Sequence, residues 1–180
     1  MEIRGSSSKM NSMDQESRAA IFAALDEWAG SVEFGLPHDL FLFLSRLTPL
    51  VNVDLLVRDE RLGTLLTWRD DEHYGPGWHI PGGIIRYKET AESRIRLTAR
   101  RELGADVEFD PVPIAVEQDI HPLRRERGHF VSLLYLCRLA GPPSEQLRHT
   151  PASPQPGQWA WHKTCPPNLL PEQHHYRRFF

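Results

Sequence analysis

The apolar positions of this 180-residue chain follow a helical period at first and a strand period afterwards. Apolar residues recur at helical spacing between Ala20 and Trp28 and again between Leu40 and Leu44, which predicts helices over about 13–30 and 38–47. Ser12, with Gln15 three residues later, predicts the cap of the first helix. Two β-rich runs follow at 50–57 and 63–68, and the turn between them predicts a hairpin.

The second half of the pattern contains one more strong helix and several short strands. A helix is expected from Thr90 to Leu103, with Gly104 as its left-handed C-terminal cap. Further strands are predicted at 107–117, 130–139 and 159–162, before a terminal helix at 171–179. The order of strands, helix, strands and helix lacks a regular βαβ alternation. It therefore favours an α+β fold, an α/β/α sandwich with a mixed β-sheet between helices.

Composition narrows the class of protein. With 40% hydrophobic and 25% charged residues, the chain fits one globular domain with modest additions. A net charge of −3 provides no basic field, so no nucleic acid partner is expected. No apolar run has the length of a membrane span, and the first residues lack the apolar core of a signal peptide. Cys137 and Cys165 form no disulfide framework, so we expect a cytoplasmic protein.

The segment between Gly82 and Gly104 carries the clearest chemistry. Gly82 and Gly83 form a double-glycine turn after a predicted strand, and the helix that follows has Glu89 before it and Glu102 near its end. A glycine carbonyl can approach an ion closely because no Cβ obstructs it. Carboxylate and carbonyl oxygens are the ligands that Mg²⁺ prefers. This arrangement suits a cation held against a diphosphate.

The spacing of Gly83, Glu89, Glu102 and Gly104 resembles the signature of the Nudix hydrolases: a Gly, five residues, a Glu, seven residues, then a block rich in Arg and Glu that ends in Gly. Only the last acidic position of the block survives here. With Pro81, the Thr48-Pro49-Leu50-Val51 run and Asp54, the motif is similar to that of the GDP-mannose mannosyl hydrolases. The similarity runs from about Phe41 to the C-terminus.

The resemblance implies a set of site residues and a cofactor. It implies Mg²⁺, with Mn²⁺ as a substitute, held by the Gly82 carbonyl, Glu102 and Gln155 of the late loop, with Gln158 as the alternative to Gln155. Arg101 stands where common family members have a carboxylate, which favours one ion. Asp54 and Glu102 are the expected catalytic carboxylates. The predicted substrate contacts are Phe41, Arg69 and Arg86.

The residue that activates water is less well defined by the sequence. Pro156 stands where the subgroup has a His directly after the ligand Gln. His149 is the predicted base, and His162, His174 and His175 are alternatives, because imidazole is half neutral near pH ~6.5. Ile84 and Leu97 replace two arginines of the subgroup.

Several residues keep two interpretations. Glu89 either stabilises the helix N-terminus or binds metal. Asp54 is either a site residue or a member of a structural pair, because an unpaired carboxylate within an apolar strand would be costly. Phe41 belongs either to the core or to a stacking site for a base. The run from Arg124 to Arg127 is either an exposed loop or a phosphate contact.

Three functional hypotheses follow. The first is a Mg²⁺-dependent hydrolase of a small-molecule nucleotide sugar similar to GDP-mannose, releasing the sugar and a nucleoside diphosphate. The second is a Nudix pyrophosphatase that cleaves a phosphoanhydride, and the third is a non-catalytic nucleotide-sugar binding protein. We expect a tail at 1–12, a helical extension at 13–36 and a Nudix hydrolase domain at 37–180. A homodimer is implied by the resemblance alone.

Overall fold

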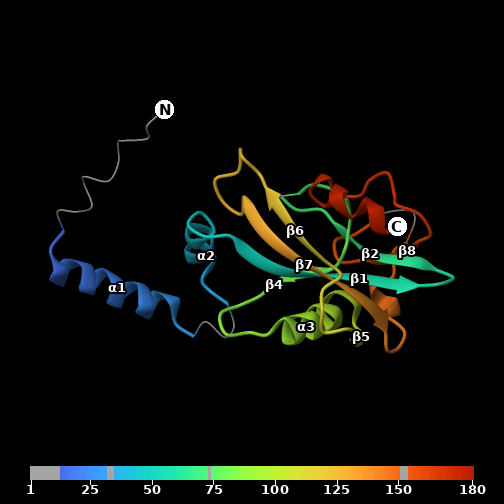
Figure 1. Cartoon of the computed structure of the whole chain (residues 1–180), viewed down its shortest axis with the longest axis horizontal. Coiled ribbons are helices and arrows are strands. Elements are labelled where there is room, and N and C mark those ends of the chain that lie inside the picture. Colours follow the sequence, from blue (N-terminus) through green and yellow to red (C-terminus); the bar gives the residue numbers. More distant parts are fainter. Residues whose placement is uncertain (1–12, 32–34, 73, 151–153) are drawn as a thin grey trace.

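A computed structural model describes residues 13–31, 35–72, 74–150 and 154–180. Within these residues, eight strands form one mixed sheet (Figure 1). The strands are β1 (Leu50–Asp59), β2 (Gly63–Arg69), β3 (Gly77–His79), β4 (Gly82–Ile84), β5 (Val107–Phe109), β6 (Ala115–Ile120), β7 (His129–Leu139) and β8 (Trp159–His162). The helices are α1 (Gln15–Ala29), α2 (His38–Leu44), α3 (Ala91–Leu103) and the 3₁₀ helices η3 (Glu145–Leu147) and η4 (Pro171–Phe179).

The sheet is built on β1, which lies at its centre. β1 pairs with β7 in parallel over eight register positions, from Leu50 opposite Phe130 to Val57 opposite Cys137. It pairs antiparallel with β2, as the predicted hairpin requires, and antiparallel with β4. β3 and β8 extend the sheet beyond β2, and β5 and β6 extend it beyond β7. The predicted mixed sheet is therefore confirmed.

Alternation along β1 separates the two faces of the sheet. Val53, Leu55 and Val57 are buried under α3, in a core that also contains Ile95 and Ala99. The intervening side chains point to the opposite face, where Leu56 packs with residues of β3 and of the C-terminal segment. Figure 1 shows α3 and η4 on opposite sides of the sheet. Asp54 lies on the η4 side, so the same alternation that builds the core places a carboxylate under η4.

Local signals explain where α3 begins and ends. The Thr90 hydroxyl accepts a hydrogen bond from the Ser93 N–H (3.1 Å), and Gly104 has φ 64°, as the predicted cap requires. Glu89 accepts hydrogen bonds from the Arg86 N–H (2.9 Å) and from the Arg94 guanidinium (2.6 and 2.8 Å). Glu89 thus ties the β4–α3 connection to the first turn of α3.

Four predicted elements differ from the structure. The turn predicted at Gly82 and Gly83 is instead part of strand β4, because both residues pair with β1. The cap of α1 is Asp14, whose carboxylate accepts from the Ser17 N–H (2.8 Å); Ser12, the expected cap, and the predicted tail at 1–12 lie outside the described residues. The strand expected at 107–117 is two strands, because Pro111 and Pro113 lack the N–H groups that a continuous ladder needs. The terminal helix is 3₁₀.

α1 has no buried residue and lies apart from the sheet in Figure 1. Among the described residues, no helix combines the length and apolar composition needed to cross a membrane.

Candidate active site

A cavity of about 210 Å³ lies between the sheet and η4, at the place where β1, β4 and α3 meet. Its walls combine polar residues that are far apart in the sequence. The lining includes Asn52, Asp54, Arg69, Tyr74, His79, Gly82, Glu102, Asp119, Arg127, Ser132, Glu172, Gln173, His175 and Tyr176. We call it the polar cavity. Of the predicted site residues, it brings together Asp54, Arg69, Gly82 and Glu102.

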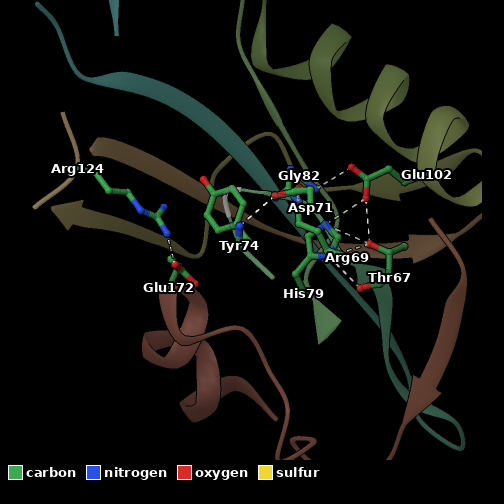
Figure 2. Close-up of polar contacts among 9 residues, drawn as sticks. All are labelled: Thr67, Arg69, Asp71, Tyr74, His79, Gly82, Glu102, Arg124 and Glu172. Carbon is green, nitrogen blue, oxygen red and sulfur yellow. Dashed lines mark hydrogen bonds and ion pairs between the residues drawn. The ribbon is translucent and has the colours of Figure 1, made fainter. Parts of the chain in front are cut away.

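Glu102 projects from the last turn of α3 toward β2 and β4 (Figure 2). Its Oε2 accepts a hydrogen bond from the Thr67 hydroxyl (3.0 Å), and its Oε1 accepts a long one from the Gly82 N–H (3.4 Å). Although 26% of the side chain is exposed, burial raises the pKa of Glu102 to about 7, against the opposing effect of the Thr67 hydrogen bond. The carboxylate is therefore held in place, but the Arg69 charge offsets its burial only in part, and no positively charged side chain of the described residues forms an ion pair with it.

His79 does not supply such a positive charge. Its Nε2 lies 3.7 Å from Oε2 of Glu102, and its Nδ1 donates to the Thr67 carbonyl (2.9 Å). Burial, followed by the nearby Arg69 guanidinium, lowers the pKa of His79 to about 3. The imidazole is consequently neutral near pH 7, so it forms no salt bridge with Glu102.

The backbone of Gly82 faces Glu102. The Leu55 N–H donates to the Pro81 carbonyl (2.8 Å), so Gly82, one residue further and opposite Asp54, falls at a non-hydrogen-bonded position of the β1–β4 pair. Its N–H points away from β1 toward Glu102, and its carbonyl leaves the strand on the same side. A Cβ here would overlap the Asp54 Oδ1. Glycine therefore allows the strand to lie against the Asp54 carboxyl group.

Asp54 is almost fully buried, with 4% of the residue exposed. Its Oδ2 accepts from the Tyr176 hydroxyl (2.5 Å), and its Oδ1 accepts from the Asn52 amide (2.9 Å). Burial raises the pKa of Asp54 to about 6, although these hydrogen bonds oppose the shift. A buried carboxyl group that lines a cavity and has a raised pKa is typical of a functional site.

A second cavity, of about 880 Å³, lies on the other side of β4 and is mainly apolar. We call it the apolar cavity. Phe41 and Leu44 of α2 line it, together with Arg86 and Arg101. It shares Gly82, Gly83, Ile84 and Glu102 with the polar cavity, so these residues separate the two. The predicted substrate contacts are thus divided, with Arg69 in the polar cavity and Phe41 and Arg86 in the apolar one.

Arg69 is positioned by neighbours from its own loop. Its Nε forms an ion pair with the Asp71 carboxylate (2.5 Å), and its guanidinium lies 4.4 Å from the centre of the Tyr74 ring. The Tyr74 N–H donates in turn to Asp71 (3.0 Å), as drawn in Figure 2. These contacts fix the guanidinium at the edge of the polar cavity.

The site residues predicted in the loop between η3 and β8 line neither cavity. Gln155 is exposed, its N–H donates to the Gln158 side chain (2.9 Å), and neither glutamine lines the polar or the apolar cavity. His149 is likewise absent from both linings; its ring packs 5.1 Å from that of Trp78. His162 packs against the same ring at 4.6 Å.

His175, one of the alternatives to His149, does line the polar cavity. Its Nε2 is buried and has no hydrogen-bond partner among the described residues. Burial lowers the pKa of His175, with the carboxylates of Glu117 and Asp119 opposing the shift. This histidine therefore presents a neutral imidazole to the cavity near pH 7.

Sequence reasoning missed several residues of η4 that complete the site. Besides Tyr176, the Gln173 side chain accepts from the Ile80 N–H (2.6 Å) and donates to the Ile80 carbonyl (3.3 Å). A glutamine that satisfies both backbone groups of Ile80 anchors η4 to the connection between β3 and β4. No local pattern marks such a contact. The only indication in the sequence is that the predicted terminal helix is amphipathic, with polar residues beside apolar ones.

The residues present fit a divalent cation at Glu102. Among the described residues no charged cation forms an ion pair with the carboxylate, and the Gly82 carbonyl faces the same side of β4 as the N–H that reaches Glu102. In the described part of the chain, no three His, Cys, Asp or Glu side chains gather closely enough to hold a metal alone. A cation here would therefore depend on Glu102, the carbonyl, water and substrate oxygens, a set that suits Mg²⁺.

Comparison with known proteins places this fold and site in a family of hydrolases. The sequence model of the NUDIX domain matches residues 48–178, so the chain belongs to the Nudix family. Over 75 residues the chain is 36% identical to the low-salt glycan biosynthesis protein Agl8 of Haloferax volcanii. That match covers 42% of this chain and 47% of the relative, about half of its length.

Solved structures show the same fold. A MutT Nudix hydrolase from Burkholderia pseudomallei aligns with 73% of this chain and 95% of its own, with a TM-score of 0.53 and 24% identity. A UDP-X diphosphatase aligns with 91% of this chain and 75% of its own, with a TM-score of 0.53 and 13% identity. At these identities the likeness concerns the fold alone.

Proposed function

We propose that this chain is a Mg²⁺-dependent hydrolase of a nucleoside-diphosphate sugar that releases free sugar and a nucleoside diphosphate. The observation that supports it most is the placement of Glu102 and Gly82 between an apolar cavity and a polar one. A nucleotide sugar has its parts in the same order: an apolar base, a diphosphate and a hydroxyl-rich sugar. Phe41 would contact the base, Arg69 and Arg86 the diphosphate, and the polar cavity the sugar.

The divalent ion, Mg²⁺ or in its place Mn²⁺, would neutralise the departing diphosphate. Glu102 and the Gly82 carbonyl would hold it, and Gln155 remains the predicted third ligand. Asp54, held by the hydrogen bond from Tyr176, would orient the sugar in the polar cavity.

For the proton acceptor we propose His175, because its buried Nε2 is unpartnered among the described residues and the imidazole is neutral. His149, predicted from the sequence, lines neither cavity. Steady-state kinetics of His175→Gln and His149→Gln separate the two. We expect the first to lower kcat by about 100-fold or more and the second to change it little. The reverse result would assign the base to His149.

Hydrolysis in ¹⁸O-labelled water tests the reaction itself. With GDP-mannose and related nucleotide sugars plus Mg²⁺, label in the released sugar supports the proposal. Label in a phosphate supports the second candidate, a phosphoanhydride-cleaving pyrophosphatase, and binding without any label indicates a non-catalytic protein. Light scattering checks the expected homodimer, and cell fractionation checks the expected cytoplasmic location.

The role of Glu102 has its own matched control. Glu102→Gln keeps the shape but removes the charge that would hold the cation, so metal-dependent turnover should fall by at least about 100-fold. Glu92 lies exposed in the first turn of the same helix, paired with Arg96 (3.0 Å), and Glu92→Gln should retain activity. Equal activity of the two variants would refute the assignment of the metal ligand.

A further inference from the structure

The loop between β6 and β7 brings arginines to the polar cavity, around the ring of Tyr74. The guanidinium carbons of Arg69, Arg124 and Arg127 lie 4.4, 4.9 and 5.6 Å from the centre of this ring. Figure 2 shows Arg124 on the side of Tyr74 that lies away from Glu102. Three cations around one ring repel each other unless anions accompany them.

Two of the three guanidinium groups have a carboxylate within the protein. Arg69 pairs with Asp71 (2.5 Å), and Arg124 pairs with Glu172 of η4 (2.7 Å). For Arg127, no carboxylate of the described residues lies within ion-pair distance. Its buried Nε has no hydrogen-bond partner among those residues either. Because a guanidinium stays charged at any relevant pH, this group lacks a compensating anion.

The backbone holds Arg127 in position for such an anion. Its N–H donates to the Ser45 hydroxyl at the end of α2 (3.0 Å), and its φ of 51° is unusual for a residue other than glycine. The neighbouring Glu126 lies 3.8 Å from the Arg46 guanidinium. These contacts attach the loop to α2 and fix an unfavourable backbone conformation. The Arg127 side chain is thereby directed between Phe41 (6.0 Å) and Tyr74.

We propose that Arg127 binds an anionic group, a carboxylate or a phosphate, on the sugar half of the substrate. The inference rests on the proposed function, in which the diphosphate lies at Glu102 and the sugar enters the polar cavity. Arg127 lines that cavity, and its Nε has no hydrogen-bond partner among the described residues. An anionic group on the sugar would accept a charge-assisted hydrogen bond from this Nε. The preferred substrates are then nucleotide sugars with an acidic sugar rather than neutral hexoses.

Calorimetric titration of the full chain in EDTA, which prevents metal-dependent turnover, compares sugars that differ only at C6. The pairs are UDP-glucuronate with UDP-glucose and GDP-mannuronate with GDP-mannose. Wild type should bind the uronate of at least one pair about tenfold or more tightly than its neutral partner. Arg127→Gln should remove the preference, and Arg127→Lys should retain part of it. Arg125, exposed in the same loop, provides the control, and Arg125→Gln should keep the whole preference.

A second measurement separates this inference from the proposed function. In a ¹H–¹⁵N spectrum, the Arg127 Nε–H signal, assigned by its absence in Arg127→Lys, should shift with free glucuronate or glucose 6-phosphate and not with glucose. A response to only one of the two acids identifies the anion as carboxylate or phosphate. If nucleotide sugars bind without preference and neither acid moves the signal, the inference is overturned while the proposed function stands. If an acid moves the signal but nucleotide sugars neither bind in EDTA nor bind or are hydrolysed when Mg²⁺ is present, the proposed function fails instead.

Discussion

Replacing Asp54 by asparagine should stabilise the protein at neutral pH. The introduced amide can accept from the Asn52 side chain with its oxygen and donate to the Tyr176 hydroxyl with its NH₂ group, so both hydrogen bonds of Asp54 have a counterpart. What disappears is the buried negative charge. The variant thus isolates the free energy of keeping Asp54 ionised in the folded state.

The magnitude follows from the pKa of Asp54. Raising the pKa of Asp54 from 3.8 to about 6 destabilises the folded protein by about 3 kcal/mol once Asp54 is ionised in both states, since each pKa unit corresponds to about 1.4 kcal/mol. Well below pH 3.8 the carboxyl is protonated in both states and the penalty is absent. Between these pH values the unfolded chain ionises first, so wild-type stability falls relative to the variant as pH rises.

Urea unfolding at about pH 4 and about pH 7.5, in EDTA, measures this difference. We expect Asp54→Asn to be more stable than wild type by up to about 3 kcal/mol at the higher pH and by little at the lower one. Asp59→Asn, at the exposed end of the same strand, should show no such gain, because backbone hydrogen bonds lower the pKa of Asp59. A loss of stability in Asp54→Asn of equal size at both pH values would refute the reasoning. It would mean that the charge is well solvated in the fold.

Two further predictions concern the packing of the motif. A Cβ at Gly83 would lie 2.5 Å from the Thr98 hydroxyl, so Gly83→Ala should lower the free energy of unfolding by about 1–3 kcal/mol. Gly141 has open space around it, so Gly141→Ala should have little effect. An unchanged urea midpoint for Gly83→Ala would contradict the contact with Thr98. Glu89→Gln removes the charged partner of Arg94, whose side chain is only 6% exposed. In the same urea assay this change should lower the free energy of unfolding by about 3 kcal/mol. A decrease well below about 1 kcal/mol would show that the ion pair adds little.

The sequence predicted the part of the molecule that depends on local rules. The hairpin, the motif helix and its Gly104 cap are confirmed, because alternation, helical period and a left-handed glycine are properties of neighbouring residues. The family resemblance predicted that Glu102 and Gly82 share a site; the structure places the Gly82 N–H 3.4 Å from the Glu102 carboxylate, and their role as metal ligands stays a prediction. The single strand predicted at 107–117 was wrong, although Pro111 and Pro113 carried the signal for a break between β5 and β6.

Long-range contacts were beyond the sequence. Tyr176 meets Asp54 across 122 positions, and Gln173 meets Ile80 across 93. Neither side chain carries a local signal, because its partner is chosen by how η4 folds over the sheet. The run from Arg124 to Arg127 left an exposed loop and a phosphate contact open as alternatives, and only the folded chain shows which arginine has a carboxylate partner.

Crystals grown with Mn²⁺ and a non-hydrolysable nucleotide diphosphate provide the most direct test of the cation site. We expect an anomalous peak about 2.1–2.2 Å from a Glu102 carboxylate oxygen and the Gly82 carbonyl oxygen, bridging to the two phosphates. A bound nucleotide with no peak there, or a peak coordinated by other residues, would contradict this expectation.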